Sequence, residues 1–81
     1  MAVYVKAVKQ SENEEAVIYS YGDNPEHLEG LIEICKKDLS WKILKKPSER
    51  NGTALAVAIV SRITNPYKET GEFPDAVFRQ S

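Results

Sequence analysis

The stretch PEHLEGLIEICKKDLSWKILKK, residues 25–46, decides the fold because it fits two different secondary structures. In the first interpretation, its beginning is a helix. Asp23 is able to cap that helix, Pro25 falls in the first turn, and Glu26 follows Asp23 at the spacing of a capping box. Apolar side chains then recur at helical spacing, at Leu28, Leu31, Ile32, Cys35 and Leu39. This interpretation predicts the element order β-β-α-β-α.

In the second interpretation, the same stretch is a β-hairpin. The segment GLIEIC (30–35) is β-branched, with an isoleucine on either side of Glu33. The segment LSWKILK (39–45) places Leu39, Trp41 and Ile43 on one face and Ser40, Lys42 and Leu44 on the other. KKD (36–38) connects the two strands. We favour the hairpin because it brings the strand with Glu33 beside the strand with the basic Lys42 and Lys45. Both interpretations make residues 39–46 a strand.

The N-terminal part predicts a first hairpin. AVYVKAVK (2–9) is short, β-branched and alternating, and EAVIYSYG (15–22) is rich in β-branched and aromatic residues. One face of the first strand holds Val3, Val5 and Ala7, and the other holds Tyr4, Lys6 and Val8. Because only the short polar segment 10–14 separates the two strands, we expect them to pair antiparallel.

The alanine-rich run TALAVAIVSRI (53–63) predicts a helix that begins near Asn51 or Gly52. Pro66 predicts that this helix ends or kinks. If it continues for another turn, Gly71 is the expected stop.

The tail is expected to fold back through Phe73 and Phe78, with the last residues frayed. The whole chain, residues 1–81, is then a single small α+β domain. Its antiparallel sheet has about four strands in the order β-β-β-β-α, with the C-terminal helix packed on one face. The other face, or an edge strand, is expected to be covered by a second copy of the chain, as a homodimer.

Composition favours a soluble, cytoplasmic domain. Cys35 is the one cysteine, whereas small secreted domains usually carry several disulfides. The first ten residues include Lys6 and Lys9, unlike a signal peptide, and no apolar run reaches the ~20 residues that span a membrane. The net charge is −1, which provides no overall attraction to nucleic acid or anionic lipid.

The charges are nevertheless segregated along the chain. Residues 11–35 carry seven acids and no Lys or Arg, and residues 36–50 carry six bases and two acids. This pattern predicts either ion pairs between neighbouring segments or a basic binding face.

The chemistry that an enzyme or a metal site needs is sparse. With one His and one Cys, we expect no metal site and no cofactor. A nucleophile–base pair of His27 and Cys35 is disfavoured, since the two lie about 12 Å apart along a helix and nothing fixes His27 beside Cys35 in a hairpin. We therefore predict no catalytic residues.

Three functions remain as hypotheses. The first is a non-enzymatic protein-interaction domain that forms a homodimer. The second is a single-stranded nucleic-acid-binding module, because basic side chains interleave with an aromatic one on a predicted strand. Its candidate residues are Lys36, Lys37, Trp41, Lys42, Lys45 and Lys46. The third is a small enzyme or ligand binder whose site forms at a dimer interface.

Overall fold

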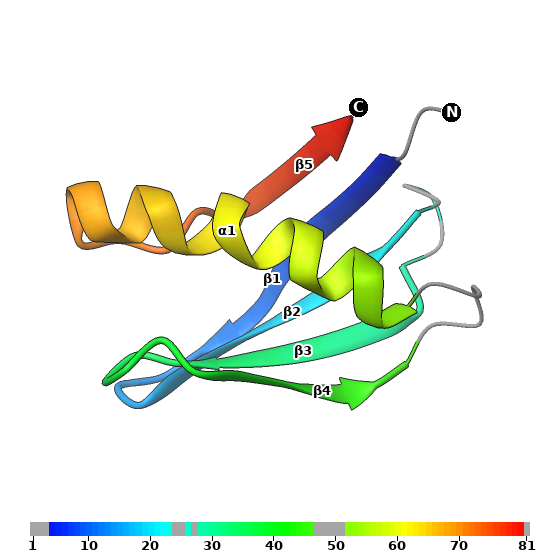
Figure 1. Ribbon diagram of the computed structural model, residues 1–81. Helices are drawn as coiled ribbons and strands as arrows, with labels where there is room; N and C mark the ends of the chain where they lie inside the picture. The colour runs from blue at the N-terminus through cyan, green and yellow to red at the C-terminus, as the bar shows by residue number, and fades with distance from the viewer. Residues whose placement is uncertain (1–3, 24–25, 27, 47–51, 81) are drawn as a thin grey trace.

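The computed structural model describes residues 4–23, 26, 28–46 and 52–80, and shows a five-stranded antiparallel sheet with one helix across one face (Figure 1). The strand order is β4-β3-β2-β1-β5. The elements are β1 Tyr4–Glu12, β2 Ala16–Gly22, β3 Gly30–Cys35, β4 Trp41–Lys45, α1 Gly52–Thr70 and β5 Ala76–Gln80. The predicted α+β class is confirmed, with a fifth strand added after the helix.

Within residues 25–46, β3 and β4 form the second of the two predicted structures, the hairpin. The helix interpretation is wrong for residues 30–35. In β3, Gly30, Ile32 and Ile34 are buried, and the residues between them are half-buried. Glu33 pairs directly with Lys42 of β4, as predicted, and their side chains lie 3.5 Å apart. The alternation of apolar residues outweighs their helical spacing, because in a strand it places all of the apolar side chains on the face that packs in the core. At the proposed helix start, Asp23 and Glu26 are not helical, and Pro25 lies outside the described residues.

The core lies between the sheet and α1. Its fully or nearly buried members are Val5, Ala7, Val17, Tyr19, Tyr21, Ile32, Ile34, Leu55, Ala56, Ile59, Ile63 and Phe73. The predicted alternation in β1 is confirmed from residue 4 onward, since Val5 and Ala7 are buried while Tyr4 and Lys6 are half-buried. Val3 lies outside the described residues. No described element covers the sheet face opposite α1, which is called the open face below (Figure 1).

The helix continues through Pro66 to Thr70, so an end at Pro66 is wrong. It stops at Gly71, as the alternative of a further turn predicted. Gly71 adopts a φ of 80°, and its amide donates to the Tyr67 carbonyl at 2.7 Å. This is the left-handed cap that glycine tolerates best. The last turn of α1, after Pro66, is stabilised by the Tyr67 ring, which stacks on Phe73 with the ring centroids 4.1 Å apart.

The expectation of a frayed end is wrong. Residues 76–80 form β5, which pairs antiparallel with β1 from Ala76 opposite Val8 to Gln80 opposite Tyr4. Phe73 is an anchor, as predicted, with only 5% of its surface exposed. Phe78 is not an anchor, because its position opposite Lys6 turns it to the open face and leaves it 62% exposed.

Candidate interaction surfaces

The residues of the predicted nucleic-acid site do not converge on one surface. Trp41 is half-buried and packs against the core on the helix side of the sheet. Lys42, the next residue along the strand, lies on the open face and pairs with Glu33. Lys45 and Lys46 are exposed at the end of β4. The strand alternation therefore separates the tryptophan from Lys42, and nucleic-acid binding by this segment stays a prediction.

The other two candidates lie in the turn between β3 and β4. Lys37 is exposed there, but Lys36 is largely covered. The Lys36 Nζ donates to Glu12 Oε2 at 2.6 Å and lies 5.9 Å from the centre of the Phe73 ring. These contacts direct Lys36 into a cluster of charges and away from a free basic face.

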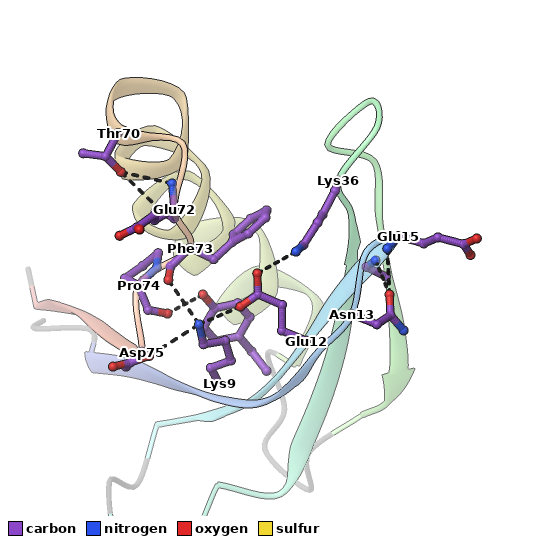
Figure 2. Close-up of polar contacts among 12 residues, drawn as sticks. Lys9, Glu12, Asn13, Glu15, Lys36, Thr70, Glu72, Phe73, Pro74 and Asp75 are labelled. Carbon is purple, nitrogen blue, oxygen red and sulfur yellow. Dashed lines mark hydrogen bonds and ion pairs between the residues drawn. The ribbon is translucent and has the colours of Figure 1, made fainter.

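That cluster joins the end of β1 to the loop between α1 and β5 (Figure 2). Glu12 accepts a second hydrogen bond from Lys9 Nζ at 2.8 Å. Lys9 also donates to the Phe73 carbonyl at 3.3 Å and lies 3.4 Å from the Asp75 carboxylate. Three segments far apart in the sequence are thus connected through Glu12 and Lys9.

The pKa values follow from these contacts. The hydrogen bond from Lys36, and then that from Lys9, lowers the pKa of Glu12. The hydrogen bond to Glu12 is the main cause that raises the pKa of Lys9. Both shifts stabilise the charged forms, whereas a general acid or base needs a pKa close to the working pH. The cluster is therefore suited to fixing the loop in place.

Tyr19 holds the same loop from the core side. Its hydroxyl donates to the Pro74 carbonyl at 2.5 Å, and burial raises the pKa of the phenol. The sequence did not predict this role for Lys9, Glu12 or Tyr19. The one signal was the acidic segment followed by a basic one, which predicted that charges pair between neighbouring segments; the Glu12–Lys36 contact confirms this pairing.

Cys35 and His27 were the thiol and imidazole candidates of the sequence. No group of three or more His, Cys, Asp or Glu side chains comes together among the described residues. Cys35 is half-buried at the end of β3, and its suggested partner His27 lies outside the described part of the chain.

The open face carries a concentration of apolar and aromatic side chains. Tyr4 of β1 stacks on Phe78 of β5, with ring centroids 6.4 Å apart and planes inclined by 24°. Val8 of β1 and Ile18 of β2 are half-buried. At the other end of the sheet, Leu44 of β4 is 45% exposed.

A groove lies beside the open edge of β5. It has a volume of about 670 Å³ and runs between α1 and β5. The helix contributes Ser61, Arg62, Asn65, Pro66 and Glu69, and the strand contributes Ala76, Val77, Phe78 and Arg79. Among the described residues, no ion pair engages Arg62, Glu69 or Arg79.

No protein-family model, curated protein or solved structure matches this chain. Within the described ranges, no helix is long and apolar enough to cross a membrane.

Proposed function

We propose that the chain is a protein-interaction domain that associates with a second copy of itself. The observation that carries the proposal is the edge strand β5, whose one described partner is β1. An edge strand offers backbone amides and carbonyls to any strand that approaches it. β5 also presents Phe78, the most exposed large hydrophobic side chain in the described residues, at 62%.

The size of the chain supports the same proposal. A domain of 81 residues buries a smaller fraction of its surface than a larger one does, so its stability margin is thin. Covering Phe78 and the stacked Tyr4 in an interface removes apolar surface from water, at roughly 25 cal/mol for each Å² buried.

The test is the mass of the chain in solution, measured by sedimentation equilibrium over a range of micromolar concentrations. We expect a mass near twice 9.1 kDa at the upper end of that range. A mass of 9.1 kDa at every concentration would refute self-association.

A further inference from the structure

We infer that the second copy joins the sheet at β5, as an antiparallel strand related by a two-fold axis at Phe78. This inference rests on the proposed self-association and specifies the element, the register and the charges that produce it. The product is a continuous sheet in which the two copies of α1 lie on the same side.

The backbone of β5 indicates which groups are free to pair. The Lys9 amide donates to the Asp75 carbonyl at 2.8 Å, so residue 75 directs its hydrogen-bonding groups toward β1. In an antiparallel ladder this direction alternates from residue to residue. Val77 and Arg79 therefore bond to β1 as well, whereas Ala76, Phe78 and Gln80 direct their amides and carbonyls away from it.

A two-fold axis at Phe78 uses all of these outward groups. Phe78 then lies opposite Phe78 of the second copy, and Ala76 lies opposite Gln80 of that copy. Directly opposite residues share a face, so the two Phe78 rings come together on the open face. Because each Phe78 ring already stacks on Tyr4, the interface extends this aromatic pair across the axis.

The helix side of the interface provides charge complementarity. Residues 71–75 alone connect the end of α1 to β5 (Figure 1), and Glu69, in the last turn of α1, lines the groove together with Ala76 and Val77. Arg79 lies at the other end, on the helix side, because it pairs with the buried Val5. The proposed register places Val77 of the second copy opposite Arg79. In this register each Arg79 approaches the groove of the second copy, where Glu69 is the one acidic residue of the lining and Arg62 is a further base. We assign Glu69 as its partner.

The opposite edge of the sheet is poorly suited to the same pairing. β4 carries Lys42 and Lys45 within five residues, and Lys46 follows directly. Lysines on an edge strand oppose pairing between identical strands, because a two-fold axis brings like charges close together. β5 carries a single charged residue, Arg79, and its central residue Phe78, on the proposed axis, has no charge.

The experiment compares dimer dissociation constants by sedimentation equilibrium for matched variants. Phe78→Asp places two carboxylates opposite each other, so it should weaken the dimer by at least about tenfold. Leu44→Asp makes the same change on β4 and should leave the dissociation constant unchanged. Both side chains are exposed, so both variants should keep the wild-type circular dichroism spectrum.

A charge exchange tests the register. Glu69→Arg and Arg79→Glu should each weaken the dimer several-fold, and the double variant should restore most of the affinity because the pair is re-formed with its signs reversed. If the wild type is a monomer, self-association itself is refuted. Two results would refute pairing through β5 in this register while self-association stands. In the first, the wild type is a dimer and Leu44→Asp weakens it as much as Phe78→Asp does. In the second, the wild type is a dimer and the double variant shows no recovery.

Discussion

Glu12 and Lys36 are 24 residues apart in the chain, yet their side chains meet at 2.6 Å. The contact joins the end of β1 to the turn between β3 and β4, and Lys9 connects the same carboxylate to the loop before β5 (Figure 2). One acidic side chain therefore helps to hold the edge strand that the proposed interface uses.

Replacing Glu12 with Gln should lower the thermal stability of the fold and change its dependence on pH. The folded-state pKa of Glu12 lies below the ordinary value of 4.5, so the unfolded state binds more protons between the two values. The stabilisation from Glu12 is therefore complete above its ordinary pKa and is lost as the pH falls through the folded value. Glu12→Gln should lack this acid-side loss.

The measurement is the melting temperature from pH 7 to pH 2, followed by circular dichroism. Glu14→Gln is the matched control, since Glu14 is exposed in the neighbouring turn. Parallel curves for wild type and Glu12→Gln across the acidic range would contradict the ion-pair interpretation.

Tyr19→Phe should destabilise the fold by about 1 kcal/mol, because the Pro74 carbonyl loses its hydrogen-bond donor. The raised pKa of Tyr19 gives a second signature. Its stabilising effect is complete below the ordinary tyrosine pKa of 10 and is lost as the pH rises through the higher folded value. An ultraviolet titration should therefore show a late phenolate step that Tyr19→Phe removes and Tyr4→Phe keeps. A late step that survives Tyr19→Phe would assign it to another tyrosine.

Gly71→Ala should cost about 1 kcal/mol, because a φ of 80° is unfavourable for a residue with a Cβ atom. No atom lies within 4 Å of the Cβ position, so the cost comes from the backbone alone. Asparagine tolerates this conformation better than alanine, and Gly71→Asn should be less destabilising. Urea unfolding curves of the two variants provide the comparison, and equal stability of Gly71→Ala and wild type would contradict the assigned cap.

The fluorescence of Trp41 should not respond to a short single-stranded oligonucleotide, because its ring packs against the core on the face opposite Lys42. Titration at low and then at moderate salt checks this expectation. Quenching that disappears as salt rises would instead support the Lys/Trp segment as a nucleic-acid surface, since phosphate contacts weaken with salt.

The alternation of Ile32 and Ile34 around Glu33 predicted the β3–β4 hairpin from the sequence, because a half-buried strand must place apolar residues at every second position. β5 was not predictable in the same way. Its five residues follow Pro74 and include Arg79 and Gln80, and they become a strand only because β1 lies beside them. Because β1 and β5 are far apart in the sequence, their pairing leaves little sequence pattern within residues 76–80.

The contacts of the charge cluster were likewise only partly predictable from the sequence. Segregated acids and bases predicted ion pairs, but they did not predict that Lys36 would turn to Glu12. The geometry around Lys9 depends on a register shift in the β1–β2 pair between Lys9 and Ser11. Such a bulge redirects side chains, and the sequence of β1 alone does not indicate its position.

The most direct test of the proposed interface is amide hydrogen exchange of β5, measured by NMR at low and high protein concentration. Val77 bonds to β1, so its amide should be protected at both concentrations. The Phe78 amide faces the open edge, and we predict that its exchange slows markedly as the concentration rises and the dimer forms. Fast exchange of Phe78 at every concentration, with Val77 protected throughout, would contradict pairing through β5.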